Sequence, residues 1–172
     1  MGLIVGLPPI SPRARVFWPL VLTLLMADCT TKELAETYLT PEQTPHQVAG
    51  SVVRFTLAHN AGAAMSLSLG RFSRPGFSIA ALLALLVLAQ LYRTTARTDR
   101  RRAAALALIV GGAVGNLGNR VLSPGGVTDF IDIGVQSWRF WSFNVADVGI
   151  TFGAILLAVV LWQEGSRRNG AA

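Results

Sequence analysis

The chain alternates between long apolar stretches without a charged residue and shorter segments in which the charges gather. Four uncharged stretches cover residues 16–27, 75–92, 103–119 and 148–163, and they are 12, 18, 17 and 16 residues long. A helix needs about 20 mainly apolar residues to cross the hydrocarbon core of a membrane. The two middle stretches approach this length, whereas the first and the last are too short.

Each short stretch reaches a spanning length only when an aspartate is included in it. Extension past Asp28 carries the first span to about residue 32, and extension back past Asp147 starts the last span at about residue 142. The pattern predicts four membrane-spanning helices, over about 16–32, 75–92, 103–119 and 142–163. An ionisable group at the margin of the hydrocarbon is a candidate functional group, although helix capping explains some such groups.

The composition agrees with a membrane protein and excludes a soluble globular domain. Hydrophobic residues make up 52% of the chain and charged residues 14%, against about 25% charged residues in an ordinary soluble domain. The net charge of +6 would suggest a nucleic-acid partner in a soluble protein, but here the basic residues bracket apolar stretches, so we expect no nucleic-acid binding. The single cysteine excludes an intrachain disulfide and a cysteine-based metal cluster, and the two histidines, without an HExxH motif, leave a zinc peptidase without its ligands.

The arginines set the expected orientation in the membrane. They precede the first span, fill the connection between the second and third spans, and follow the fourth span. By the positive-inside rule, both termini and that connection are cytoplasmic, and the loops 33–74 and 120–144 face outward. A cleavable lipoprotein-type leader is a rival reading of the N-terminus, but Asp28 stands before Cys29 where such leaders need a small residue, so we expect the first span to be retained.

The first outward loop contains a strand-like alternation of apolar and polar residues over 53–57, and the second contains an aromatic-rich segment over 138–141 that suits a membrane interface. Neither loop is long enough for an independent domain. We therefore predict an all-α integral membrane protein, one membrane-embedded domain over 1–172. It has four transmembrane helices and a small extracytoplasmic β element.

Two aspartates are candidates for catalysis at the outer face. Asp129 follows the third span and Asp147 heads the fourth, so antiparallel neighbouring helices can bring them together. Two close carboxylates share one proton, which allows one to activate water while the other donates to a carbonyl. The alternative is that Asn144 or Asp147 caps the fourth span and Asp129 caps a turn. Asp132 is a third nearby acid, and the pattern leaves open which acid faces Asp147.

Three further groups of residues stand near the predicted outer face. Gly111 and Gly115 allow a neighbouring helix to approach closely, and Asn116 and Arg120 share one helix face. Asp28 and Lys32 have the spacing of a structural ion pair within the first span. The small-residue run 60–66, which begins with Asn60, permits close approach of a ligand or a helix.

Five elements, in order along the chain, resemble the lipoprotein signal peptidases, the type II signal peptidase family of bacterial inner membranes. They are DCTTK at 28–32, NAGAAMS at 60–66, GGAVGNLGNR at 111–120, VTDFI at 127–131 and FNVAD at 143–147. The resemblance implies that Asp129 and Asp147 are the catalytic pair. It also implies substrate-binding or supporting roles for Asn60, Gly62, Asn116, Arg120, Asn144, Ala146, Asp28 and Lys32.

The same resemblance implies an aspartic-type endopeptidase that uses no metal or organic cofactor. Its substrates would be diacylglyceryl-modified prolipoproteins, cut just before the lipidated cysteine. We expect a monomer in the inner membrane, in contact with membrane lipid, with its active site at the extracytoplasmic face. Inhibition by globomycin-type peptide antibiotics is a further expectation.

The chain departs from the family pattern at a few positions. Asn119 replaces the usual aspartate before Arg120, and Ala61, Met65 and Val148 replace the usual threonine, aromatic and small hydroxyl residues. These changes leave a catalytically weakened homologue, which binds lipoprotein precursors, as an alternative. A small transporter is a further alternative, but the acids gather at one face and the span 75–92 is uncharged, whereas a proton relay needs ionisable groups through the membrane depth.

Overall fold

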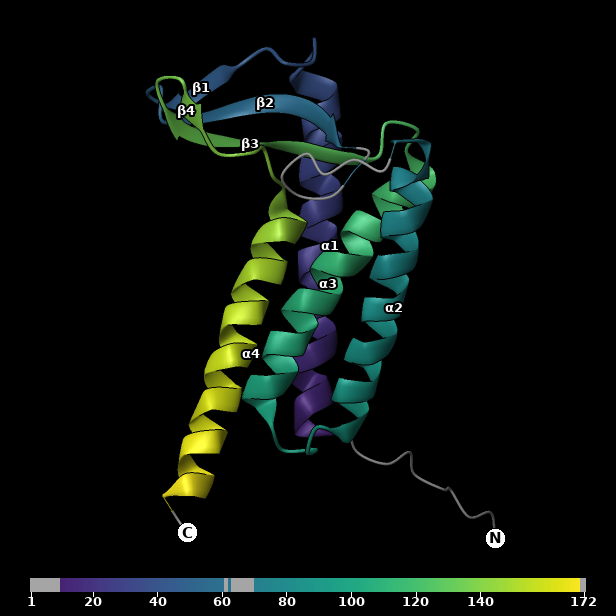
Figure 1. Ribbon diagram of the computed structural model, residues 1–172, viewed down its shortest axis with the longest axis vertical. Coiled ribbons are helices and arrows are strands. Elements are labelled where there is room, and N and C mark those ends of the chain that lie inside the picture. The colour runs from purple at the N-terminus through teal and green to yellow at the C-terminus, as the bar shows by residue number, and fades with distance from the viewer. Residues whose placement is uncertain (1–9, 61, 63–69, 171–172) are drawn as a thin grey trace, which may run out of the picture.

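The computed structural model describes residues 10–60, 62 and 70–170, in which four long helices stand side by side and a small sheet lies across one end (Figure 1). The helices are α1 (Pro12–Tyr38), α2 (Ser73–Thr94), α3 (Arg100–Leu122) and α4 (Val145–Asn169), and a short 3-10 turn, η2 (Gly70–Phe72), leads into α2. All four are long and apolar enough to cross a membrane. The prediction of four spans with a small β element is therefore confirmed.

Two helix boundaries differ from the expected ones. Helix α1 continues to Tyr38, beyond the expected end near residue 32. Its last turns pack against the sheet through Ala35, which is buried with Leu57 and Phe130. Helix α4 begins at Val145, later than the expected residue 142, because the side chain of Asn144 caps it. An N-cap residue has extended backbone angles, so the helix cannot continue back through it.

The sheet has four antiparallel strands in the order β1 (His46–Ala49), β2 (Val53–Asn60), β3 (Val127–Val135) and β4 (Trp138–Arg139). Strand β2 confirms the predicted strand-like segment. Strand β3 was not predicted, and it places Asp129 inside a strand, where the sequence analysis expected a turn or the end of a helix.

Helix α3 is the centre of the bundle, because it packs against each of the other three helices. Glycines make its contacts close: a Cβ at Gly112 would collide with the backbone of Ala146 on α4, and a Cβ at Gly111 would lie 3.2 Å from Leu24 on α1. The predicted role of the small residues in helix packing is confirmed. The close approach brings α1, α3 and α4 together beneath the sheet.

The two ends of the bundle differ in chemistry. At the sheet end, Leu57 and Phe130 of the sheet pack on Ala35 of α1. At the opposite end (Figure 1), where α1 begins and α4 ends, the helix termini and the α2–α3 connection carry nine of the fourteen arginines. Arg13 there donates to the carbonyl oxygen of Tyr92 at 3.0 Å, and Arg102 forms an ion pair with Glu164.

Candidate active site

Asn144 joins the two acids that the sequence analysis paired. The segment before α4 runs beside β3, where the backbones of Phe143 and Ile131 exchange hydrogen bonds. This places the fully buried Asn144 next to Asp129, whose Oδ1 accepts a hydrogen bond from Asn144 Nδ2 at 2.7 Å. Asn144 Oδ1 accepts from the backbone N–H of Asp147 at 3.0 Å. The predicted capping of α4 therefore occurs, and the same residue also contacts Asp129.

Asp129 is a buried carboxyl group held by two amide donors. It is 4% exposed, and its second oxygen, Oδ2, accepts from Asn60 Nδ2 at 3.3 Å. Burial, followed by the charge of Asp147, raises the pKa of Asp129 to about 6, although the hydrogen bonds from Asn60 and Asn144 act in the opposite direction. A carboxyl group with this pKa exchanges its proton near neutral pH, as acid–base catalysis requires.

Asp147 stands in the first turn of α4. Its Oδ1 accepts from Asn116 Nδ2 at 2.8 Å, and its Oδ2 accepts from the backbone N–H of Asn144 at 3.3 Å. The N-terminus of a helix favours a negative charge, because unpaired backbone N–H groups and the helix dipole face it. Asp147 and Asp129 are thus both hydrogen-bonded to Asn144, but Asp147 lies at a helix N-terminus and Asp129 lies inside a strand.

Asp132 belongs to a separate ionic cluster. It is 6% exposed, and it accepts hydrogen bonds from Arg139 at 2.7 Å and from Arg54 at 2.8 Å. Burial alone would raise the pKa of Asp132, but the two guanidinium groups outweigh burial and leave the pKa below its ordinary value. Of the two acids in β3, Asp129 is therefore the one that shares a neighbour with Asp147, which the sequence pattern left open.

A buried ion pair of α1, Asp28–Lys32, is hydrogen-bonded to residues that contact or adjoin Asp147. Lys32 Nζ lies 2.7 Å from Asp28 Oδ2, which confirms the predicted pair, and it donates to Asn116 Oδ1 at 2.9 Å. Asp28 Oδ1 accepts from the backbone N–H of Ala146 at 2.9 Å. Hydrogen bonds therefore run without a break from α1 through Asn116 to Asp147, and they also tie α4 directly to α1.

Arg120 also contacts Asn116, and its positive charge interacts with the charges of both Asp129 and Asp147. Its guanidinium donates to the backbone oxygens of Gly62 and Asn116, each at 3.3 Å. The backbone N–H of Gly62 in turn donates to Asn60 Oδ1 at 2.9 Å. The departures at Ala61 and Met65, like residues 63–66 of the small-residue run as a whole, lie outside the described residues.

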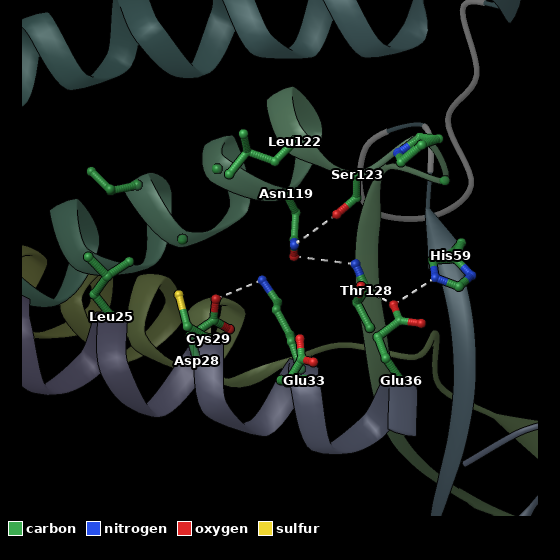
Figure 2. A pocket seen from close by; sticks show the side chains of 16 residues that line it. Leu25, Asp28, Cys29, Glu33, Glu36, His59, Asn119, Leu122, Ser123 and Thr128 are labelled. Carbon is green, nitrogen blue, oxygen red and sulfur yellow. Dashed lines mark hydrogen bonds and ion pairs between the residues drawn. The ribbon is translucent and has the colours of Figure 1, made fainter. Parts of the chain in front are cut away.

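Asn119 faces away from this network. Its amide oxygen lies 3.5 Å from the backbone nitrogen of Thr128, and its amide nitrogen lies 3.5 Å from Ser123 Oγ (Figure 2). These contacts border a cavity of about 530 Å³ between α1 and α3. Asn119, which replaces the usual aspartate, therefore contacts Thr128. Arg120 is oriented instead by its hydrogen bonds to the carbonyl oxygens of Gly62 and Asn116.

The structure brings all ten predicted site residues into one connected region at the sheet end. Sequence reasoning missed the residues that hold the sheet there, above all Arg54, Arg139, His59 and Thr128. A β-branched run over 127–135, which begins just after Gly126, is typical of a strand and could have revealed β3. The partners of Arg54 and His59 lie far away in sequence, and no pattern of spacing indicates them.

Similarity to known proteins points to a family for this chain. The family model described as signal peptidase (SPase) II matches residues 20–163. A lipoprotein signal peptidase of Ectopseudomonas mendocina (strain ymp) is 37% identical over 170 residues, which is 96% of this chain and 99% of the relative. A lipoprotein signal peptidase of Geobacter sulfurreducens is 38% identical over 160 residues, 92% of this chain and 98% of the relative.

Two solved structures are similar in fold as well as in sequence. A bacterial membrane enzyme solved by the in meso method at 2.3 Å resolution superposes with a TM-score of 0.82 at 25% identity, over 94% of this chain and 96% of the other. A second such enzyme, solved at 1.9 Å resolution, gives a TM-score of 0.73 at 29% identity, over 83% of this chain and 90% of the other.

Proposed function

The chain belongs to the signal peptidase II family, and we propose that it removes signal peptides from diacylglyceryl-modified prolipoproteins by cutting just before the lipidated cysteine. Membership of the family makes the chain an aspartic-type peptidase, which is a hydrolase. The observation that carries the proposal is the position of Asn144, whose side chain donates to one buried acid and caps the helix turn that holds the other.

In the proposed mechanism, Asp147 is the base and Asp129 the acid. The first turn of α4 and the donors around Asp147 favour its ionised form, whereas burial and the charge of Asp147 keep the proton on Asp129 up to about pH 6 in the free site. Asp147 takes a proton from water as the water oxygen attacks the scissile carbonyl carbon, and Asp129 donates to the carbonyl oxygen. The proton on Asp147 then passes to the leaving nitrogen as the C–N bond breaks, and Asp129 takes back a proton from the hydroxyl group whose oxygen becomes the carbonyl of the new carboxyl group.

Arg120 is proposed to hold the backbone of the substrate. Its Nε–H group is buried and has no acceptor among the residues that the structure describes, while Nη2 donates to the carbonyl oxygen of Gly62 and Nη1 to that of Asn116. A guanidinium group in this state can donate to a peptide carbonyl of the bound signal peptide. Asn60 and Gly62 would line the same side of the site, since they are hydrogen-bonded to each other and to Asp129 or Arg120.

The proposed setting is the bacterial inner membrane, with the sheet end at the extracytoplasmic face. Nine of the fourteen arginines lie at the opposite end of the bundle, as expected for a cytoplasmic side. A lipid-anchored cysteine keeps the scissile bond near the membrane surface, so acids at the sheet end of the bundle, Asp129 in β3 and Asp147 at the start of α4, are at the right depth for it. We expect the enzyme to act as a monomer in contact with membrane lipid and to bind globomycin-type inhibitors.

The experiment that tests this function compares two forms of one precursor. Purified protein in lipid nanodiscs is incubated with a prolipoprotein that carries the diacylglyceryl group and with the same precursor without the lipid. Mass spectrometry should find a product that begins with the lipidated cysteine, and only from the lipidated form. Equal cleavage of both forms, or a cut at another bond, would contradict the proposal.

A further inference from the structure

Two side chains of the sheet converge on a single carboxylate of α1, on the cavity side of β2 and β3 (Figure 2). His59 Nε2 lies 2.8 Å from Glu36 Oε1, and the hydroxyl of Thr128 donates to the same oxygen at 2.7 Å. His59 of β2 and Thr128 of β3 are direct cross-strand partners. One glutamate therefore holds both strands of the pair.

His59 is positively charged in this arrangement. Its second ring nitrogen, Nδ1, lies 2.6 Å from Glu42 Oε1, so each nitrogen faces a carboxylate oxygen. An ionised carboxylate only accepts hydrogen bonds, and a neutral imidazole has a single N–H group, so both contacts are satisfied when the ring is doubly protonated. Burial lowers the pKa of His59, but Glu36 and Glu42 outweigh burial and leave the pKa above its ordinary value.

The opposite face of the same two strands carries the candidate active site. Successive side chains of a strand point to opposite faces, so Asn60 and Asp129, which follow His59 and Thr128 in the chain, point away from Glu36. Asn60 donates to Asp129 there. The position of the His59–Thr128 pair against α1 therefore sets the position of Asp129.

Thr128 is held at each of its polar groups. Its hydroxyl donates to Glu36, its carbonyl oxygen accepts from Asn144 Nδ2 at 3.3 Å, and its backbone nitrogen lies 3.5 Å from Asn119 Oδ1. The residue is 2% exposed. The backbone directly before Asp129 is therefore fixed from α1, from α3 and from the start of α4.

Helix α1 is a common support for both acids. Ala146, the residue before Asp147, donates its backbone N–H to Asp28 of α1. Thr128, the residue before Asp129, donates its hydroxyl to Glu36 of α1. These two points of α1 are eight residues apart in one continuous helix, which corresponds to about 12 Å along its axis. The distance along a rigid helix thus helps to set the separation of the acids.

We propose that Glu36, His59 and Thr128 form a positioning anchor for the catalytic pair, in which the cationic ring and the hydroxyl hold β2 and β3 on α1 and thereby fix Asp129 relative to Asp147. The three residues of the anchor are positioning residues, because they act through the strands. The anchor rests on the proposed function, since its effect is expressed in the rate of peptide cleavage. Glu42 is an outer partner of the anchor and helps to keep His59 charged.

The first test replaces His59 with glutamine, and the matched control makes the same change at the other histidine, His46, which is exposed in β1. His59→Gln should lower kcat for the lipidated precursor by about 10-fold to 100-fold, since small displacements of catalytic groups have effects of this size, and should leave KM within about 2-fold. His46→Gln should leave both constants within about 2-fold. Thermal unfolding in detergent micelles gives the folded fraction to which kcat is normalised.

Four further variants separate the anchor from a general loss of packing. His59→Arg restores a permanent cation with donors for both glutamates, so its kcat should return to within about 3-fold of the wild-type value. Glu36→Gln should also lower kcat. The double variant with His59→Gln should be no slower than the slower single variant, because each substitution already removes the ion pair between His59 and Glu36. Thr128→Val removes only the hydroxyl and serves if His59→Gln does not fold; it should lower kcat by at least about 3-fold.

A spectroscopic readout is independent of turnover. The chain has two histidines, so NMR titration of isotope-labelled imidazoles, with His46→Gln for assignment, gives each pKa directly. The pKa of His59 should lie above the ordinary histidine value in the wild type and should lose this elevation in the Glu36→Gln, Glu42→Gln double variant. A wild-type His59 that is neutral at pH 6 would overturn the anchor.

The outcomes distinguish the anchor from the function on which it rests. No cleavage by the wild-type protein would contradict the proposed function. Wild-type cleavage with kcat unchanged in folded His59→Gln or Thr128→Val would overturn the anchor and leave the function standing. A kcat for His59→Arg as low as that for His59→Gln would also overturn it, because a cation at this position would then not be what holds the strands.

Discussion

Replacing Asn144 with serine separates the cap that its side-chain oxygen gives to α4 from the hydrogen bonds that its amide nitrogen donates, of which the one to Asp129 is the shortest. Serine caps a helix about as well as asparagine does, so the backbone N–H of Asp147 should keep its acceptor. Serine has no amide to donate to Asp129, whose Oδ1 receives the 2.7 Å hydrogen bond from Asn144. The variant therefore removes a donor from Asp129 and leaves the start of α4 in place.

The size of the effect follows from that hydrogen bond. A hydrogen bond to a charged group contributes about 1.5–3 kcal/mol, and each pKa unit corresponds to about 1.4 kcal/mol. The bond favours the ionised form of Asp129, so its loss should raise the pKa of Asp129 above the present value of about 6. The pH at which kcat/KM falls on the alkaline side, where Asp129 gives up its proton, should move upward by about 1 to 2 pH units.

The assay is the pH dependence of kcat/KM for cleavage of the lipidated precursor, because this constant reports the ionisations of the free enzyme. Asn144→Ala is the matched variant: it should show the same upward shift together with a loss of about 1 kcal/mol of stability from the missing cap. If turnover is too slow, infrared titration of the carboxyl band, assigned with Asp129→Asn, gives the same shift. An alkaline limb that stays in place in both variants would refute the role assigned to Asn144.

Four other substitutions test the surroundings of the site. A Cβ at Gly115 would lie 2.5 Å from Asp28 Oδ2, so Gly115→Ala should lower thermal stability by about 1–3 kcal/mol and reduce cleavage, whereas Gly118→Ala, where a Cβ meets open space, should stabilise α3. Asp132→Asn should weaken the sheet by about 2–4 kcal/mol at neutral pH, measured by hydrogen exchange of the strand amides. Because the pKa of Asp132 is lowered in the folded chain, the difference from wild type should be full above pH 3.8 and shrink as the pH falls below it. Asn119→Asp should change kcat/KM by less than about 3-fold, since residue 119 does not orient Arg120; a large gain would show that the native site is weakened.

The helical part of the fold follows from simple physical limits on the sequence. Charges are costly in hydrocarbon, so the uncharged stretches located all four helices. The first and last stretches are too short to cross a membrane unless Asp28 and Asp147 are included, which made these two aspartates candidates. The arginine pattern separated the two ends of the bundle. Hydropathy alone therefore located the spans and two of the acids at the sheet end before any comparison.

The sheet was harder to predict, because its stability comes from contacts distant in sequence. The residues that pair in β2 and β3 are about 70 positions apart, and the ionic cluster of Asp132 joins side chains 78 positions apart. The expectation of a turn or helix end at Asp129 was wrong for this reason. Asp129 was still identified as a candidate, because the VTDFI element carries the family resemblance even where its local structure was not predicted.

The central claim, that Asp129 and Asp147 act as one catalytic pair, is tested most directly by single carboxyl-to-amide substitutions. Cleavage of the lipidated precursor is measured for Asp129→Asn, Asp147→Asn and, as a control, Glu33→Gln, which makes the same change at an exposed site on α1. Both aspartate variants should remain folded and lose at least about 1000-fold in kcat, while the control stays within about 2-fold of the wild type. Cleavage at the wild-type rate by either aspartate variant would contradict the account.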